Sequence, residues 1–118
     1  MRILGIDIGT TTISVIMIDG DSGESIGTRT IAHHGFLEGH IPAAKIQDPQ
    51  KMLNITQNAV KELTDEFGTP DSIGLTGQMH GMLYVDENGN AVSPAYIWQD
   101  GCGNLPMEDG TTYAEYMK

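Results

Sequence analysis

The chain has few of the residues that would point to a secreted, membrane-embedded or nucleic-acid-binding protein. Its 118 residues include one cysteine, five prolines and one tryptophan, and only six lysines and arginines against sixteen acidic residues. Cys102 has no partner for an internal disulfide, and no apolar run approaches the roughly 18 residues that indicate a membrane helix. The first residues lack the basic and apolar regions of a secretory signal. The expected location is the cytoplasm.

The formal net charge of -10 argues against partners that are themselves anionic. Such a charge repels nucleic-acid phosphates and anionic lipid headgroups, so neither nucleic-acid binding nor membrane binding is expected. The phosphates of a bound nucleotide would have to be neutralised by backbone N–H groups and a divalent cation rather than by a basic patch. With 39% hydrophobic residues and 15 glycines, the composition is that of a turn-rich globular domain.

The first third of the chain predicts three antiparallel strands. Apolar, β-branched residues from Ile3 to Ile8 and from Thr12 to Ile18 flank a tight Gly-Thr-Thr connection, which is typical of a β-hairpin. The turn-forming segment DGDSG precedes a third strand from Ser25 to Ala32. The segment from His33 to Gln47 shows no period and is expected to be a surface loop.

A helix and several shorter elements follow. The spacing of apolar residues predicts a helix from Pro49 to Phe67, with Asp48 as its N-cap and Gly68 as its stop. Short strands are expected at residues 72–76, 82–85 and 95–98, a hairpin turn at 86–90, and the start of a last helix at 111–118. The order of strands, helix and strands indicates one α/β domain or part of one.

The turn between the first two strands carries residues suited to a phosphate. In the segment GIDIGTTT, residues 5–12, Asp7 ends a buried strand, and Gly9 and three threonines follow. N–H groups and hydroxyls in such a turn can bind phosphate, and Asp7 can hold a magnesium ion or its waters between itself and the phosphate. For this motif alone, an ordinary hairpin with a polar tip is the alternative.

A second segment, residues 76–101, has the composition of a sugar site. Gln78 and His80 lie beside glycines at the end of a strand. Met79 and Trp98 can supply apolar walls, which suits a sugar with one polar edge and one carbon face. A histidine satisfied by backbone groups is the alternative for His80.

Together the two segments resemble the FGGY carbohydrate kinases, with GIDIGTTT as the phosphate motif and GQMHG followed by AYIWQD as the sugar-binding region. The resemblance implies a ribonuclease H-like, actin-like α/β fold, ATP and Mg²⁺ as cosubstrate and cofactor, and a ketose such as xylulose or sedoheptulose as substrate. The magnesium and ATP phosphates would lie at Asp7, Gly9, Thr10, Thr11 and Thr12. The sugar would lie at Gln78, Met79, His80, Trp98 and Asp100.

Two features depart from the family pattern. Cys102 stands where the family commonly has an arginine, and a thiol cannot form the bidentate pair that a guanidinium makes with a carboxylate. Without a basic neighbour in sequence, this thiol is expected to be unreactive. Residues 1–118 would form the amino-terminal part of the first kinase domain, because the family's catalytic aspartate and adenosine pocket come from segments that would follow Lys118.

With the second domain absent and no catalytic base in the chain, the chain alone is expected to be inactive. Surfaces that the absent part would cover are expected to favour self-association. A non-catalytic sugar- or nucleotide-binding module derived from a kinase half is the alternative function. An actin-like or Hsp70-like ATPase shares the phosphate hairpin but has no place for GQMHG and the Trp98 segment. His33, His34 and His40 lack partners at a structural-zinc spacing and are expected to be solvated loop residues.

Overall fold

The computed structural model describes residues 1–118, which form two compact units. The sheet unit combines Met1–Gly35 with Pro49–Gln78, and the loop unit combines Phe36–Asp48 with Met79–Lys118. Each unit is therefore built from two separate stretches of the chain. The predicted α/β class is confirmed, and most of the regular structure lies in the sheet unit.

The sheet unit contains a four-stranded sheet in the order β3-β2-β1-β6. Its strands are β1 (Arg2–Ile8), β2 (Thr12–Asp19), β3 (Ser25–Ala32) and β6 (Ser72–Gly77). The first three form the predicted antiparallel meander, and β6 pairs with β1 in parallel. A parallel neighbour requires a crossover connection, and the helix between β3 and β6 lies in that connection.

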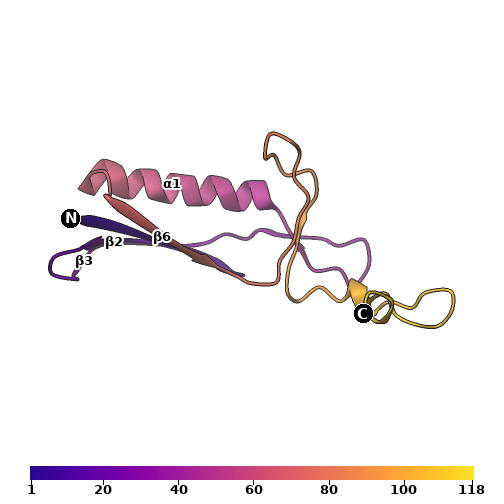
Figure 1. Ribbon diagram of the computed structural model, residues 1–118. Helices are drawn as coiled ribbons and strands as arrows, with labels where there is room; N and C mark the ends of the chain where they lie inside the picture. The colour runs from indigo at the N-terminus through magenta and orange to yellow at the C-terminus, as the bar shows by residue number, and fades with distance from the viewer. The chain divides into compact units, whose positions relative to one another are not determined.

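This helix, α1 (Pro49–Phe67), lies along one face of the sheet (Figure 1). It begins and ends where the sequence predicts. Gly68 follows it with a φ of 96°, a left-handed conformation that commonly ends helices and that glycine adopts without steric cost. The main core joins α1 to β1 and β2 through Leu4, Ile13, Val15, Met17, Met52, Ala59 and Leu63.

The two faces of the sheet differ because successive side chains of a strand point to opposite sides. Leu4 is buried, and its partner Ile73 points to the same face, as does Leu75 further along β6. Since α1 packs mainly over β2 and β3, Ile73 and Leu75 stay exposed by 61% and 71%. The opposite face of β1, which carries Asp7, is not covered by α1.

The loop unit contains a three-stranded sheet in the order β4-β5-β7. Its strands have two residues each and are β4 (Phe36–Leu37), β5 (Ile46–Gln47) and β7 (Ala95–Tyr96). The expectation that residues 33–47 form only a loop was therefore wrong, because β4 and β5 pair within this segment and β7 adds to β5. Such short strands leave no period in the sequence, and β7 comes from far along the chain.

The strand predicted at residues 82–85 does not form. Met82 makes an isolated bridge with Tyr96, and Val85 makes one with Ala91. Neither bridge extends into a ladder, although the segment is a short apolar run, which is consistent with a strand.

The turn at residues 86–90 forms as predicted. The N–H of Gly89 donates to the carbonyl oxygen of Asp86 at 3.0 Å, and the N–H of Asp86 donates to that of Asn90 at 2.9 Å. The Asp86 carboxylate also accepts the N–H groups of Asn90 and Asn88, and these bonds lower the pKa of Asp86 below its ordinary value.

The last part of the loop unit contains a 3-10 helix, η1 (Cys102–Asn104), and a single helical turn, α2 (Tyr113–Tyr116). The predicted helix start is confirmed, but it gives only one turn. Thr112 and Glu115 form a capping box, in which the N–H of Glu115 donates to Thr112 Oγ1 at 3.2 Å and the N–H of Thr112 donates to the Glu115 carboxylate at 3.0 Å. None of the helices is both long enough and apolar enough to cross a lipid bilayer.

Candidate phosphate and sugar site

The connection between β1 and β2, residues 9–12, is a tight turn that we call the phosphate turn. The N–H of Gly9 donates to the carbonyl oxygen of Thr12 at 2.9 Å. A Cβ at residue 9 would lie 2.9 Å from the same oxygen, so a larger residue would displace the backbone. The flanking strands fix the ends of the turn, since Ile8 pairs with Ile13.

Asp7 precedes the phosphate turn on the sheet face that α1 leaves open. Its side chain is exposed, and its carboxylate makes no hydrogen bond or ion pair within the protein. Ser14 of β2 and Thr76 of β6 are its neighbours on the adjoining strands. All three line a hollow of about 420 Å³, to which the paired Gly5 and Gly74 add no side chains. The Asp7 carboxylate is therefore accessible to a cation.

The threonines of the phosphate turn differ in what their hydroxyls contact. Thr10 Oγ1 donates to Oε1 of Gln78 at 3.2 Å. Thr11 and Thr12 are exposed, and their hydroxyls make no hydrogen bond within the protein. Two hydroxyl groups of the phosphate turn are thus available to an anion, whereas Thr10 links the turn to the segment that follows β6.

Gln78 lies at the phosphate turn, although the sequence pattern groups it with the sugar residues. Its N–H donates to the carbonyl oxygen of Ile8 at 2.9 Å, and its side-chain oxygen accepts the Thr10 hydroxyl. Gln78 belongs to the sheet unit, whereas the adjoining Met79 belongs to the loop unit. In this structure Gln78 supports the phosphate turn, and its contact with a sugar stays a prediction.

The chemistry around Asp7 suits a magnesium ion that arrives with a nucleotide. Mg²⁺ in nucleotide sites takes one or two protein carboxylates and otherwise phosphate oxygens and water. Asp7 offers one unpaired carboxylate beside hydroxyl groups. The chain has no cluster of three or more His, Cys, Asp or Glu side chains that would hold a metal by itself. These residues therefore fit a metal ion that takes one ligand from Asp7 and its other ligands from a bound phosphate and water.

The other residues predicted to bind sugar lie on the loop unit. Met79 and Trp98 are 73% and 55% exposed, and His80 has a φ of 60°, which is uncommon for any residue except glycine. The bridge between Met82 and Tyr96 connects their segments, because His80 and Trp98 each stand two residues from a bridged residue. The loop unit thus presents an imidazole and an indole on two connected segments.

Asp100 contacts the backbone of its own unit. One carboxylate oxygen accepts the N–H of Lys45 at 2.8 Å, and the other accepts the N–H of Cys102 at 2.9 Å. Burial acts to raise the pKa of Asp100, but these hydrogen bonds outweigh it and lower the pKa below its ordinary value. Asp100 is therefore a loop anchor, and its predicted sugar contact would use the remaining lone pairs of the same oxygens.

Cys102 stands beside Asp100 at the position where the resemblance predicts an arginine. Its Sγ lies 3.6 Å from Oδ2 of Asp100. Burial and the neighbouring carboxylate raise the pKa of the thiol, which disfavours the reactive thiolate. The structure supports the expectation of an unreactive thiol, which replaces the arginine fork by one weak donor.

His33 contradicts the expectation that all three loop histidines are solvated. Its side chain is 1% exposed, whereas His34 and His40 are exposed. The reason is that the alternation of β3 continues past its end, so that Ile31, His33 and Gly35 all turn inward. The residue types do not show this period, because the inward positions 27, 29, 31 and 33 are Gly, Arg, Ile and His, so the sequence carries no clear signal for the burial of His33.

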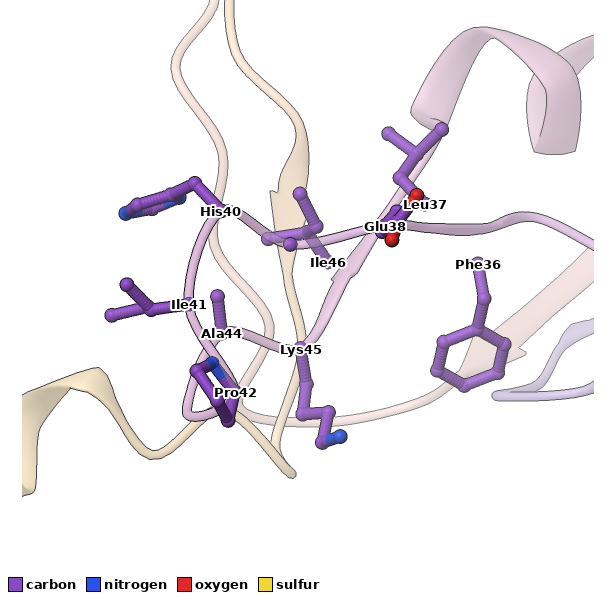
Figure 2. Close-up of a pocket in the computed structure, with 10 residues that line it drawn as sticks. Phe36, Leu37, Glu38, His40, Ile41, Pro42, Ala44, Lys45 and Ile46 are labelled. Atoms are coloured by element: carbon purple, nitrogen blue, oxygen red, sulfur yellow. The ribbon is translucent and has the colours of Figure 1, made fainter.

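A second hollow, of about 400 Å³, lies in the loop unit along the segment from Phe36 to Ile46 (Figure 2). Glu38 and Lys45 on its wall carry opposite charges, and most of its other lining residues are apolar. This mixture favours no single class of ligand. Met79, His80, Trp98 and Asp100, which are predicted to bind sugar, lie in the same unit but do not line this hollow.

Both motifs fall within a region of the chain that matches a known protein family. Residues 2–108 match the N-terminal domain of the FGGY family of carbohydrate kinases. The chain belongs to this family. It is 35% identical over 104 residues to a xylulose kinase of Staphylococcus epidermidis and 32% identical over 100 residues to one of Escherichia coli. Each match covers 83% of this FGGY chain and 20% of the relative.

The solved structure of a xylulose kinase from Rhodospirillum rubrum has the same fold. It superposes with a TM-score of 0.75 at 23% identity, over 88% of this chain and 22% of that one. The ribonuclease H-like, actin-like fold predicted from the sequence is thereby confirmed as a partial domain. The FGGY chain spans 20% of the length of each of the two xylulose kinases named above.

Proposed function

We propose that this chain supplies the phosphate turn and the sugar-binding segment of an ATP-dependent kinase that phosphorylates a hydroxyl group of a ketose. It corresponds to the amino-terminal part of the first kinase domain. One observation carries the proposal: an unpaired carboxylate, Asp7, stands two residues before a turn whose Thr11 and Thr12 hydroxyls are unpaired. The relatives named above are xylulose kinases, which favours xylulose over sedoheptulose as the substrate.

At the phosphate turn, each residue has a defined task. The Thr11 and Thr12 hydroxyls donate hydrogen bonds to the phosphate oxygens of ATP, and Gly9 keeps the turn tight. Asp7 would bind the cation directly or accept hydrogen bonds from the water molecules of the cation. Magnesium, when bound, neutralises the charge of the phosphates, which a chain with a net charge of -10 has few basic residues to do.

In the loop unit, His80 and Trp98 contact the ketose. The imidazole hydrogen-bonds a sugar hydroxyl, and the indole and Met79 cover the carbon face of the sugar. The left-handed backbone of His80 costs on the order of 1–3 kcal/mol, a strain that often marks functional positions.

Titration of the isotope-labelled chain with Mg·ATP tests the phosphate assignment. We expect the amide signals of Thr11 and Thr12 to shift, and we expect Asp7→Asn to weaken the response about tenfold by removing the charge that holds the cation. The matched control is Asp65→Asn, which removes one exposed carboxylate from α1. Equal responses in the two variants would contradict the role of Asp7.

Titration with ketoses tests the sugar assignment in the same way. We expect xylulose to shift the signals of the Trp98 indole and of Met79, and sedoheptulose to shift them less. His80→Asn is the informative variant, because asparagine tolerates a positive φ and removes only the imidazole. A xylulose response unchanged by His80→Asn would remove His80 from the site.

The isolated chain is expected to be inactive because the catalytic aspartate that the resemblance implies lies outside residues 1–118. A coupled assay should detect no ADP release above background when xylulose is added to chain and Mg·ATP. Xylulose-dependent release by the purified chain, abolished by Asp7→Asn, would overturn this expectation.

A non-catalytic binding module is the second candidate. The anchoring role of Asp100 and the thiol at Cys102 favour it, because both change the setting that the family pattern gives to the sugar. A module should bind xylulose or Mg·ATP by itself with micromolar affinity, whereas half of a kinase site should bind only in the millimolar range. Calorimetry on the isolated chain separates the two candidates.

We further propose that the isolated chain self-associates through β6, with a second copy of the chain as the partner. β6 pairs on one side only, and Ile73 and Leu75 beside this edge are exposed. Sedimentation should show a concentration-dependent dimer that Leu75→Lys disrupts and Leu53→Lys, an exposed position on α1, does not. A monomer at every concentration would disprove it.

A further inference from the structure

His33 is the most deeply buried ionisable side chain of the sheet unit, and neither motif includes it. It follows directly after β3, and its ring is 1% exposed. The adjoining His34 has a φ of 48°, and the next residue, Gly35, is buried. A Cβ at residue 35 would lie 2.8 Å from Nδ1 of His33. The backbone therefore bends tightly around the imidazole.

The hydrogen bonds of His33 determine its tautomer. The N–H of Gly35 donates to Nδ1 of His33 at 2.9 Å, so Nδ1 carries no proton. Nε2 of the neutral ring therefore carries the proton and donates it to the carbonyl oxygen of Gly9 at 3.0 Å. One ring thus connects the chain after β3 to the first residue of the phosphate turn.

The backbone of His33 makes a second contact with the same turn. Its N–H donates to the carbonyl oxygen of Thr11 at 3.1 Å. A single residue therefore engages the carbonyl groups of both Gly9 and Thr11. Carbonyl oxygens repel phosphate oxygens, so a phosphate-binding turn benefits when its carbonyls are paired with protein donors and its own donors are free. The Thr11 hydroxyl is one such free donor.

We propose that His33 is a positioning residue of the phosphate turn, which fixes the Gly9 and Thr11 carbonyls so that the donors of the turn can engage an anion. The inference rests on the proposed phosphate-binding role of the turn. His33 itself does not contact the nucleotide. Its effect on binding is exerted through the bond from Nε2 to Gly9.

Two conservative variants separate the two ring bonds. In His33→Gln the side-chain nitrogen reaches the place of Nε2 and keeps the bond to Gly9. In His33→Asn the side-chain oxygen replaces Nδ1 and keeps the bond from Gly35, but the bond to Gly9 is lost. Both residues are polar amides, so the pair differs mainly in which contact survives.

The test measures hydrogen exchange of the Gly9 amide and the Mg·ATP titration of the Thr11 and Thr12 signals. In His33→Asn we expect exchange at Gly9 to be about fivefold to tenfold faster and Mg·ATP binding to be weaker by a similar factor, as for the loss of one hydrogen bond. His33→Gln should stay within about twofold of wild type. Exchange at Leu4 and Val15 in the core should not change in either variant, which shows that the fold is intact.

Three outcomes decide the proposal. If the Gly9 amide exchanges equally in both variants and wild type, His33 does not fix the turn and the proposal is wrong. If exchange differs but Mg·ATP affinity does not, His33 has only a structural role and the proposal is also wrong. If the wild-type chain shows no Mg·ATP response, the proposed function fails, while faster exchange in His33→Asn alone still establishes His33 as the residue that fixes the turn.

One further measurement needs no variant. The nitrogen chemical shifts of the His33 ring in the wild-type chain report which ring nitrogen carries the proton. We expect a proton on Nε2 and none on Nδ1. A proton on Nδ1 would rule out the bond from Gly35, and with it the geometry on which the proposal depends.

Discussion

The sheet unit and the loop unit are stabilised in different ways. In the sheet unit, α1 and three strands enclose a continuous apolar core that includes Leu4, Val15 and Leu63. In the loop unit, few side chains are buried, namely Ala44, Ile46, Gln47 and Ile97. The phosphate turn is therefore attached to a packed scaffold, whereas residues 79–100, which we call the sugar segment, belong to a unit of short strands and turns.

Polar contacts take the place of a core in the loop unit. Asp86 and Asp100 each accept two backbone N–H groups, and Thr112 caps α2. Regions with few buried apolar contacts open locally at low free energy, and binding loops commonly belong to this class. The difference predicts that the sugar segment adapts to its ligand while the phosphate turn is preformed.

The largest expected effect concerns the core of the sheet unit. Leu63→Ala removes a fully buried side chain from α1 and should lower the free energy of unfolding by about 2–5 kcal/mol. Leu53→Ala is the matched control, because Leu53 lies on the same helix and is 47% exposed. Chemical denaturation followed by circular dichroism measures both. Similar losses in the two variants would show that the assigned core face of α1 is wrong.

The corresponding change in the loop unit is Ile97→Ala, which truncates one of its few buried side chains. The N–H of Ile97 donates to the carbonyl oxygen of Lys45 at 3.1 Å, so we expect faster hydrogen exchange at Ile97 and Tyr96. Amides of β1 and β2 should keep their protection. If Ile97→Ala destabilises those strands as much as Leu63→Ala does, the two units unfold as one and the comparison fails.

A smaller effect is expected at the cap of α2. Thr112→Ala removes the hydroxyl that accepts the N–H of Glu115 and should cost about 1 kcal/mol of local stability. Thr112→Ser should restore most of it. Amide exchange at Tyr116, whose N–H donates to the carbonyl oxygen of Thr112, provides the measurement. Equal exchange in all three proteins would show that the capping box does not stabilise this turn.

The subtlest effect is the response to acid. The pKa of Asp100 is lower in the folded chain than its ordinary value, so its contribution to stability is present above the unfolded pKa of about 3.9 and is lost as the pH falls through the folded pKa. Exchange at the Lys45 and Cys102 amides should therefore rise below about pH 4, beyond the ordinary pH dependence of exchange. In Asp100→Asn this additional rise should disappear. A rise that persists in the variant would point to another carboxylate, such as Asp86.

Much of the sheet unit could be predicted because its signals are local. The strands from Ile3 to Ala32 follow from β-branched runs and turn residues, and α1 follows from apolar spacing with a glycine stop. In the loop unit such signals misled: residues 82–85 have a strand-like pattern but form only single bridges. A two-residue strand such as β5 has too few residues to show a period at all.

For the candidate site, too, local sequence signals predicted some features and missed others. The sequence by itself singled out the residues that we propose carry the chemistry, since Asp7, the threonines, His80 and Trp98 stand in the two motifs that resemble the FGGY family. Only the tertiary structure showed which contacts hold the phosphate turn in place. These are the parallel pairing of β1 with β6, the hydrogen bond between Thr10 and Gln78, and the burial of His33 against Gly9. The physical reason is that these contacts join residues distant in sequence, so no local pattern of residue types specifies them.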